Sequence, residues 1–460
     1  MQFVPAVHRL LSLRLDGIFR PALIGAVGTA LIGWGSCHPE FAFGGGWASP
    51  LVNSIGLSLP MPWNRVIIIL GVLLVVAAWW LARPTSGERS HKQWLLLAIW
   101  SVPLLLVPPV LSSDAVLYAD LGWIINVGQN PYLVGLTGAG GPYAPYVDPL
   151  WAGSGVAYPP LALLTNALMV AVTRSAPYLG VIAMRLPILL ALAVIAWVLP
   201  KLASQLGAEE AKATWWGLAN PLVMLHFVGG AHNDALMIAV ALVGIWVALR
   251  GQHWAWGLLA GPAIIGAAMA FKQQAGLAVV AAAGLPIAAR LAGLPPVRRV
   301  VLPAQRTIVA AVVAVATFAG VSLATGLGFG WLNWLTLMGK ANTPAPFSLL
   351  AQGVEFLIAR AGGDASGVLS AISAISTVVS LAVLAWILIR FADRPLAAVG
   401  WGSLAVSILG QSLHPWYLPW SLALLALVPL TRKQFGWLTG FAVGFAVWNT
   451  VQTVIWHGQP

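Results

Sequence analysis

The sequence predicts an all-α polytopic membrane protein, and three observations support this fold class. Hydrophobic residues make up 60% of the 460 residues and charged residues only 8%, whereas a soluble protein carries about 25% charged residues. Apolar stretches of a length close to the roughly 20 residues that cross a bilayer recur along the chain. Lys and Arg residues gather between these stretches. A soluble globular protein is therefore excluded, and the high apolar content excludes a disordered chain.

Thirteen spans are predicted, and the whole chain, 1–460, is expected to form one transmembrane domain. The spans cover 21–37, 64–82, 93–111, 179–200, 213–228, 231–249, 254–271, 275–292, 307–328, 367–391, 396–412, 415–430 and 434–456. Two further apolar stretches, 157–173 and 346–361, are short, flanked by proline or amphipathic. We expect these two to be partial or re-entrant helices.

The basic residues predict the orientation of the chain in the cytoplasmic (plasma) membrane. Their clusters are Arg9, Arg14 and Arg20; Arg83, Arg89 and Lys92; Lys201 and Lys212; Arg250; Arg290, Arg298, Arg299 and Arg306; Arg390 and Arg394; Arg432 and Lys433. The positive-inside rule assigns them to the cytoplasm. The N-terminus is then inside, the C-terminus outside, and 112–156 forms a long external loop. The net charge of +11 orients the chain and requires no nucleic-acid partner.

A short interfacial helix is predicted directly after the third span. Ser112-Ser113-Asp114 has the pattern of a helix N-cap, and Gly128 is a typical stop. A helix over 114–127 is too short to span and is expected to lie along the interface. Asp114 either caps this helix or is a functional carboxylate, because ionisable groups near the membrane are costly. Asp120 follows about 240° around the helix, so the two carboxylates do not converge from one face.

The external loop continues with aromatic residues and prolines, and it carries no Lys or Arg between 112 and 174. Asn130, Tyr132 and Tyr158 belong to this loop. Rigid aromatic loops shape sugar or lipid sites, but aromatic residues also gather at membrane interfaces. The sequence leaves both interpretations open.

A third polar cluster, His232-Asn233-Asp234, follows Gly229-Gly230 at the external start of a span. A helix cap explains one of these three polar residues but not all of them together. His232 and Asp234 are also the candidate ligands of a divalent cation, although two ligands at this spacing are a weak metal signal. The single cysteine, Cys37, excludes an internal disulfide and a Cys-rich metal site.

Further polar residues are predicted at the same external level. Lys272 and Gln273 lie in a turn between two otherwise apolar spans. As a compact charge, Lys272 is a candidate phosphate partner, and the alternative is that it snorkels to the interface. The remaining members of the set are His414, Trp416, Tyr417, Lys340 and Asn342. Clusters so far apart in sequence predict a common cavity at the outer leaflet.

Such a cavity suits group transfer from a lipid-linked phosphosugar to a polar acceptor. A carboxylate can act as general base on the incoming hydroxyl, and positive charge, with or without a metal, can stabilise the departing phosphate. The chain has no Walker-type loop, which argues against ATP-driven transport. Its loops are also too short for a nucleotide-sugar-binding domain.

Several motifs resemble those of known enzymes. Asp114 and Tyr118, Gly122, the run 128–132 and Gly135 resemble the first external loop of integral-membrane glycosyltransferases of the GT-C type. Asn220-Pro221-Leu222, the run 229–236, Lys272 and Pro415-Trp416-Tyr417 are similar to motifs of actinobacterial polyprenol-phosphate-mannose-dependent α-(1→6)-mannosyltransferases of the MptA/MptB type. The resemblance extends from about Leu104 to Tyr417, and the order of the motifs carries it.

The resemblance implies a GT-C-type fold and an inverting transfer with Asp114 as catalytic base. It implies polyprenyl-phosphate mannose as donor and a lipid-linked mannan, as in lipomannan and lipoarabinomannan, as acceptor. No cofactor is implied beyond a divalent cation at His232 and Asp234, whose presence stays open. The expected substrate-binding residues are Tyr118, Asp120, Asn130, Tyr132, Tyr158, His232, Asn233, Asp234, Lys272, Gln273, His414, Trp416 and Tyr417.

Three alternatives remain at this point. The same fold can transfer another lipid-linked sugar, such as arabinofuranose or glucose. A lipid or saccharide transporter also needs many spans, but its ionisable groups are expected near the bilayer midplane and often in inverted repeats. A structural scaffold would need neither Asp114 nor Lys272.

Overall fold

The computed structural model describes residues 15–40, 49–251, 253–291, 293–340 and 343–456. Within these ranges the regular elements are helices, and no β-strand occurs. The predicted basic residues Arg9 and Arg14, and the candidate Asn342, lie outside the described residues. The all-α prediction is confirmed for the part of the chain that the structure describes.

Seven helical segments of the described chain are long and apolar enough to cross a membrane, which agrees with a polytopic membrane protein. They are Gly17–Ser36, Trp63–Leu81, Pro177–Gln205, Gln273–Leu291, Pro296–Ala324, Val368–Arg390 and Arg432–Ile455. The pair Val223–Gly229 and Asp234–Ala248, bent by 109°, is one further broken span or a re-entrant loop. The predicted number of thirteen spans therefore stays a prediction.

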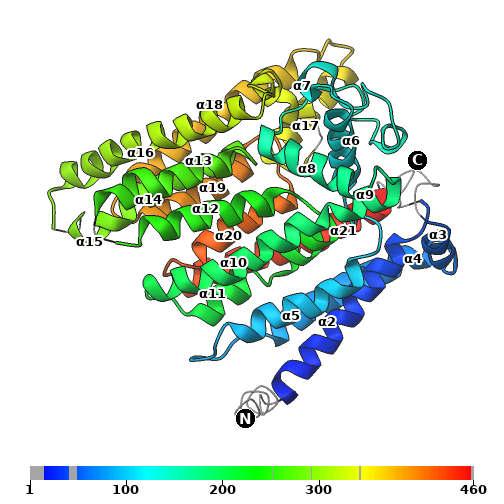
Figure 1. Ribbon diagram of the computed structural model, residues 1–460, viewed down its shortest axis with the longest axis horizontal. Coiled ribbons are helices and arrows are strands. Elements are labelled where there is room, and N and C mark those ends of the chain that lie inside the picture. The colour runs from blue at the N-terminus through cyan, green and yellow to red at the C-terminus, as the bar shows by residue number, and fades with distance from the viewer. Residues whose placement is uncertain (1–14, 41–48, 252, 292, 341–342, 457–460) are drawn as a thin grey trace.

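The helices form one bundle, in which the long helices run side by side (Figure 1). In chain order the α-helices are α2 (Leu15–Ser36), α3 (Pro50–Leu57), α4 (Trp63–Leu81), α5 (His91–Ser101), α6 (Asp114–Asn126), α7 (Pro131–Val134), α8 (Pro160–Val172), α9 (Pro177–Ala183), α10 (Arg185–Gln205), α11 (Glu210–Gly217), α12 (Asp234–Ala248), α13 (Gly261–Met269), α14 (Ala278–Gly284), α15 (Ala288–Leu291), α16 (Pro296–Ala324), α17 (Pro346–Arg360), α18 (Val368–Arg390), α19 (Pro395–Leu409), α20 (Leu418–Leu425) and α21 (Arg432–Trp456). Short 3₁₀ or π turns connect them: η1 (Val102–Leu104), η2 (Ala144–Tyr146), η3 (Val223–Gly229), η4 (Trp256–Ala260), η5 (Gln273–Leu277), η6 (Leu285–Ile287), η7 (Gly330–Lys340) and η8 (Pro415–Tyr417).

The predicted short helices are confirmed. Stretch 157–173 contains α8, and stretch 346–361 contains α17, each too short to count as a long span. The helix predicted over 114–127 is α6, which begins at Asp114 and ends at Asn126; its position at the membrane interface stays a prediction. The residue after its C-cap, Gly128, has a φ of +77°, the left-handed conformation that glycine adopts without strain at the end of a helix.

Two predicted spans are wrong in extent, and both carry the polar residues of interest. The span 93–111 ends early, because α5 stops at Ser101 and irregular chain follows η1. Pro103, Pro108 and Pro109 lie in this segment, and proline removes a backbone donor that a helix interior needs. The segment 105–113 therefore leads to Asp114 as irregular chain instead of helix.

The span 213–228 is also interrupted. Helix α11 ends at Gly217, and the chain resumes at η3 as a π-helix. Pro221 lies at the interruption, and the Oδ1 atom of Asn220 accepts a hydrogen bond from the Val223 N–H at 3.1 Å. Because η3 and α12 meet at 109°, His232 lies in the bend between two helices and not inside one. Such π-helical segments are frequent at functional sites.

Three more predicted spans are wholly or partly shorter helices, whereas the span 275–292 coincides with the long segment Gln273–Leu291. The span 254–271 consists of η4 and α13. The span 396–412 contains α19, which ends at Leu409, and 415–430 contains η8 and α20. Glycine and proline inside these apolar runs divide them into short helices, which hydropathy alone does not reveal.

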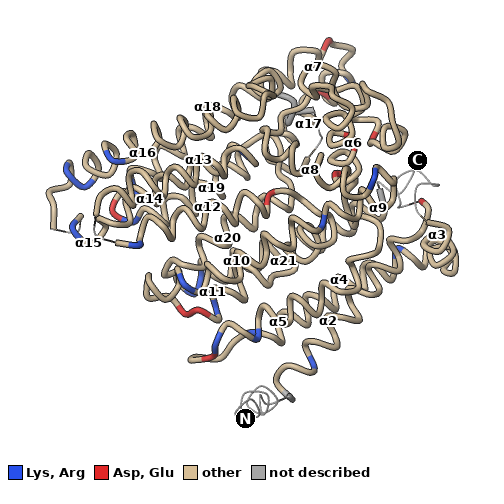
Figure 2. The backbone as a smooth tube through the Cα atoms, in the orientation of Figure 1, with Lys and Arg blue, Asp and Glu red and all other residues tan. Residues whose placement is uncertain are grey.

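The two ends of the bundle differ in charge (Figure 2). Most Lys and Arg residues gather near α11, α15 and the starts of α5 and α16. Helices α6, α7, α8 and α9 gather at the other end (Figure 1). This separation matches the predicted division between basic loops and the loop 112–156, while the assignment of either end to a side of the membrane stays a prediction.

Helix α6 packs tightly against α8, and Gly122 makes this approach possible. A Cβ atom at position 122 would lie 2.5 Å from the backbone oxygen of Asn166 and 2.9 Å from the Cγ2 atom of Val170. The backbone of Asn166 cannot move without moving α8. Side-chain size at this one position therefore sets the distance between the helix that carries Asp114 and its neighbour.

We expect Gly122→Ala to destabilise the protein by about 1–3 kcal/mol through overpacking. The measurement is the thermal unfolding of the purified protein in detergent. Gly353→Ala in α17 is the matched control, because a Cβ atom there meets open space and alanine favours a helix. Equal unfolding temperatures of the two variants would contradict the close α6–α8 contact.

Candidate active site

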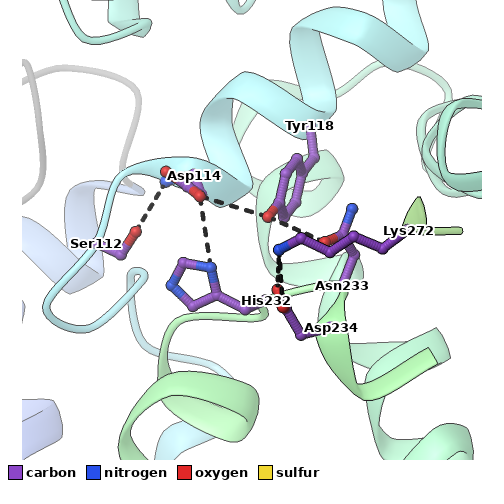
Figure 3. Close-up of polar contacts among 7 residues, drawn as sticks. All are labelled: Ser112, Asp114, Tyr118, His232, Asn233, Asp234 and Lys272. Atoms are coloured by element: carbon purple, nitrogen blue, oxygen red, sulfur yellow. Dashed lines mark hydrogen bonds and ion pairs between the residues drawn. The ribbon is translucent and has the colours of Figure 1, made fainter. Parts of the chain in front are cut away.

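Asp114 stands at the first position of α6, and its carboxylate contacts two side chains (Figure 3). Its Oδ2 atom lies 3.4 Å from the hydroxyl of Tyr118 and 3.4 Å from Nδ1 of His232. The N-cap position itself is Ser113, and the backbone N–H of Asp114 donates to Ser112 Oγ at 3.2 Å. The carboxylate therefore contacts side chains and does not accept hydrogen bonds from the backbone of the first helical turn, which argues against the capping interpretation. It remains 18% exposed.

His232 reaches Asp114 from the bend between η3 and α12. Its imidazole is buried and stacks on Trp416, with 3.7 Å between ring centroids and 16° between planes. His414 also stacks on Trp416, at 4.4 Å and 10°. Tyr417 meets His414 edge-on at 5.3 Å. The structure thus brings together predicted residues of the third polar cluster, His232, and of the last one, His414 and Tyr417, around the indole ring of Trp416.

A buried ion pair lies beside this stack. The Nζ atom of Lys272 donates to both carboxylate oxygens of Asp234, at 2.7 and 2.8 Å. The same ammonium group lies 4.6 Å from the centroid of the Tyr417 ring, a favourable cation–π geometry. Because Lys272 is only 4% exposed, the interpretation that it snorkels to the interface is wrong.

Tyr118 and Asn233 connect the two halves of the site. The Tyr118 hydroxyl lies 3.5 Å from Oδ1 of Asn233 as well as near Asp114. Its ring meets that of Tyr158 edge-on, with 5.5 Å between centroids. Residues predicted from three separate segments are thus in direct contact (Figure 3).

The electrostatics keep the Asp114 carboxylate ionised. Burial raises its pKa, but the hydrogen bond and charge of His232, followed by the charges of His414 and Lys272, hold the pKa below the ordinary 3.8. Burial lowers the pKa of His414 to about 4, so this imidazole is neutral at neutral pH. The site therefore offers a charged base beside the neutral His414 imidazole and the buried ion pair of Lys272 and Asp234.

Asn130, Tyr132 and Gln273 support the surrounding loop. The Oδ1 atom of Asn130 accepts the Tyr132 N–H at 2.9 Å and caps α7. The Tyr132 hydroxyl donates to the Tyr158 carbonyl at 2.7 Å, and Nε2 of Gln273 donates to the Ala157 carbonyl at 3.0 Å. Tyr132 and Gln273 thus bind the backbone carbonyl groups of Tyr158 and Ala157, and Asn130 orients the start of α7 that carries Tyr132. Their predicted contact with substrate stays a prediction.

Asp120 is engaged elsewhere in α6. It is fully buried, and its Oδ2 atom accepts the Thr137 N–H at 2.8 Å. Burial raises its pKa to about 6, although this hydrogen bond acts in the opposite direction. The structure therefore gives Asp120 a part in holding the loop that follows α7 against α6.

The two residues considered for a metal ion have different partners. His232 contacts Asp114, whereas both oxygens of Asp234 are occupied by Lys272. Among the described residues no group of three or more His, Cys, Asp or Glu side chains could hold a metal ion. The arrangement thus differs from the predicted His232–Asp234 pair.

Arg185 organises the site and is not among the predicted residues. Its guanidinium group is buried, and it donates to carbonyl oxygens of two segments. On the segment leading to Asp114 it binds Leu105, Val107 and Pro108, and on the segment leading to His232 it binds Val228 and Gly229, at 2.7–3.5 Å. The Val110 N–H also donates to the Gly229 carbonyl at 3.1 Å. Arg185 therefore sets the position of Asp114 relative to His232.

His226 is a second residue that sequence analysis missed. It is fully buried in η3, 6.0 Å from the His232 ring and 5.7 Å from Trp416 between centroids. Neither ring nitrogen has a hydrogen-bond partner among the described residues. Both His226 and Arg185 are ionisable residues within apolar runs of the sequence. Such residues are costly in a membrane and often functional, so this feature could have identified them.

Comparison with known proteins identifies the class of this membrane protein. Residues 22–290 match the family described as α-(1→6)-mannopyranosyltransferase, N-terminal domain, and residues 348–453 match the MptB C-terminal domain. The chain belongs to this MptA/MptB family and is a glycosyltransferase. No solved structure gives a significant match.

The relatives cover most of the chain. It is 30% identical to α-(1→6)-mannopyranosyltransferase A of Mycobacterium tuberculosis, over 92% of this chain and 83% of the relative. It is 31% identical to a second α-(1→6)-mannopyranosyltransferase of that organism, over 97% and 83%. It is 27% identical to α-(1→6)-mannopyranosyltransferase A of Corynebacterium glutamicum, over 88% of each chain. The resemblance inferred from the motifs is confirmed, and the transporter and scaffold alternatives are not supported.

We expect Arg185→Lys to lower the stability markedly, because a lysine offers three donors from one nitrogen and cannot reach both segments. Each buried carbonyl left without a donor costs about 1–3 kcal/mol. Thermal unfolding measures the loss, with Arg298→Lys, an exposed position, as the matched control expected within about 0.5 kcal/mol of the parent. An Arg185→Lys protein that unfolds like the parent would show that the clamp is dispensable.

Proposed function

We propose that this enzyme transfers mannose from polyprenyl-phosphate mannose to a lipid-linked mannan acceptor, with inversion, on the external face of the cytoplasmic membrane. The linkage formed is α-(1→6). The names of the relatives, α-(1→6)-mannopyranosyltransferases, support the sugar and the linkage. The many apolar helices support a lipid-borne donor and acceptor, since both can reach the site from the bilayer.

The contact between Asp114 and His232 carries the proposal. A general base must be ionised, accessible and within hydrogen-bond reach of the proton that it removes. The Asp114 carboxylate is partly exposed, and its neighbours favour the charged form. Its contacts of 3.4 Å are long, as is common before substrate binds. An acceptor hydroxyl can therefore enter and hydrogen-bond to the free Oδ1 side of this carboxylate.

The chemical step follows from that base. Asp114 takes the proton of the acceptor 6-hydroxyl as its oxygen attacks the anomeric carbon of the donor mannose. The bond from that carbon to the phosphate oxygen breaks, and polyprenyl phosphate leaves with the electron pair. The attack proceeds in line from the face opposite the phosphate, so a β-linked donor gives an α-linked product. The proton on Asp114 is then released to solvent.

Lys272 and the imidazoles of His232 and His414 stabilise the departing phosphate in this proposal. An ammonium group has three donors, and two of the three in Lys272 are directed at Asp234. The third is available for a phosphate oxygen. The His414 imidazole, which is neutral at neutral pH, can take up a proton when an anion enters the site and then donate a hydrogen bond to it. Tyr132, Trp416 and Tyr417 line the path of the sugar or the lipid.

We expect Asp114→Asn to lower the rate of mannose transfer by about 10²–10⁴-fold, the usual contribution of a general base. The assay uses radiolabelled polyprenyl-phosphate mannose and a short synthetic α-mannoside acceptor with the purified protein. Asp364→Asn, in the exposed loop before α18, is the matched control and should retain activity. Full activity of a folded Asp114→Asn protein would exclude the assigned role, and thermal unfolding shows whether the protein folds.

The pH profile tests the contact with His232. Activity requires ionised Asp114, so the rate falls as the pH drops through its pKa. His232→Phe removes the hydrogen bond and charge that lower this pKa, while burial still raises it and the aromatic ring can still stack on Trp416. We therefore expect the acidic limb of log(kcat/KM) to move to higher pH.

The exposed His253 provides the control, His253→Phe, whose profile should match the parent. An unchanged acidic limb in His232→Phe would mean that His232 does not set the charge state of the base. A lower but parallel profile would assign His232 to binding alone.

A further inference from the structure

A long groove lies between α5 and α10, outside the site around Asp114. Its volume is about 940 Å³, at the upper end of the roughly 300–1,000 Å³ of ligand sites. Its walls are apolar over most of its length; they include Leu97 and Ala98 of α5 and Leu189, Leu192, Ala193 and Ala196 of α10. An extended apolar groove in a membrane protein suits a hydrocarbon chain.

The groove is polar at one end only. His91, Lys201, Gln205 and Glu210 line this end, where the basic residues of the bundle gather (Figure 2). From Leu189 to Lys201 the helix rises about 18 Å, so the apolar part is long enough for much of an acyl chain. At the opposite end lies Leu105, whose carbonyl oxygen accepts a hydrogen bond from Arg185.

The charges at the polar end are complementary to a zwitterion. The Nζ atom of Lys201 lies 5.2 Å from the Trp197 ring centroid, and among the described residues no carboxylate forms an ion pair with it. Glu210 likewise has no ion-pair partner among these residues. Trp94, Trp197 and Trp246 also line the groove, and amphipathic indole rings favour the head-group level of a bilayer.

We propose that this groove binds a glycerophospholipid whose head group carries a phosphate and a primary ammonium group. The phosphate pairs with Lys201 and receives a hydrogen bond from His91. The ammonium group pairs with Glu210 and Gln205, and the acyl chains lie along α5 and α10. The bound lipid holds these two helices at a fixed spacing and thereby supports the segment from Leu105 to Asp114. The lipid is neither donor nor acceptor of the transferase reaction.

Native mass spectrometry of the purified full chain tests the proposal. The delipidated protein is supplied with phosphatidylethanolamine, phosphatidylglycerol or phosphatidylcholine in detergent, and bound lipid is counted after mild activation. We expect preferential retention of phosphatidylethanolamine. A ligand that binds the folded state also raises the unfolding temperature, so thermal unfolding with each lipid gives a second, independent readout.

Three variants locate the binding site. Ala193→Trp fills the groove and should abolish retention of all three lipids. Lys201→Gln and Glu210→Gln should each weaken phosphatidylethanolamine binding about two- to fivefold, the range expected for one partly exposed ion pair. Only Glu210→Gln should remove the preference over phosphatidylglycerol. Lys433→Gln, a basic residue outside the groove, is the control and should bind as the parent does.

Several results would overturn the proposal. Equal retention of the three lipids by the parent would mean that the head group is not recognised. Unchanged retention in Ala193→Trp would mean that the lipid binds elsewhere. If inorganic phosphate raised the unfolding temperature as much as the lipid does, the groove would bind only an anion and not the whole lipid. Because binding and unfolding are measured without substrate, these results are independent of the transferase assay.

Discussion

The relative position of the base and its partner histidine depends on one buried guanidinium group. Asp114 and His232 each follow a segment without regular α-helix, and such segments have carbonyl groups that water cannot satisfy inside a membrane protein. Arg185 binds the carbonyl groups of both segments at once. It satisfies the interrupted backbone and also fixes the distance across the site. The two segments lack the regular hydrogen bonds of an α-helix, but the hydrogen bonds to Arg185 still hold them in fixed positions.

The candidate site could be predicted from the sequence because charge is scarce. With 12 Asp and Glu residues in 460, each acidic residue outside the basic loops is conspicuous, and Asp114, Asp234 and their neighbours are indeed in contact or adjacent in the fold. The pairing itself could not be predicted. Whether Lys272 faces Asp234, a phosphate or the interface depends on how η5 approaches α12, and this distance is a property of packing alone.

The fold could be predicted in class but not in detail. Hydropathy detects apolar runs, and α2, α4, α16 and α18 lie where such runs predict them. It does not detect where a run stops being a straight helix, because the residues on either side of the interruption are equally apolar. The segment from α11 to η3 is an example: Asn220 and Pro221 interrupt it, while His226 remains inside it. Arg185 and His226 were missed because they lie within such runs.

The interruptions and the polar residues have a common physical cause. In a continuous α-helix the backbone N–H and C=O groups are hydrogen-bonded to each other. A membrane helix can therefore bind polar substrates only through its side chains. Where the helix stops, at 105–113, 218–220, 230–233 and 410–414, backbone groups and the residues beside them become available for other contacts. Irregular backbone at membrane depth is tolerated where it is buried in protein or lines a cavity. The polar residues at these interruptions, together with Asp114 at the start of α6, are therefore the part of the bundle able to bind a polar sugar substrate, whereas the unbroken helices around them present mainly apolar side chains.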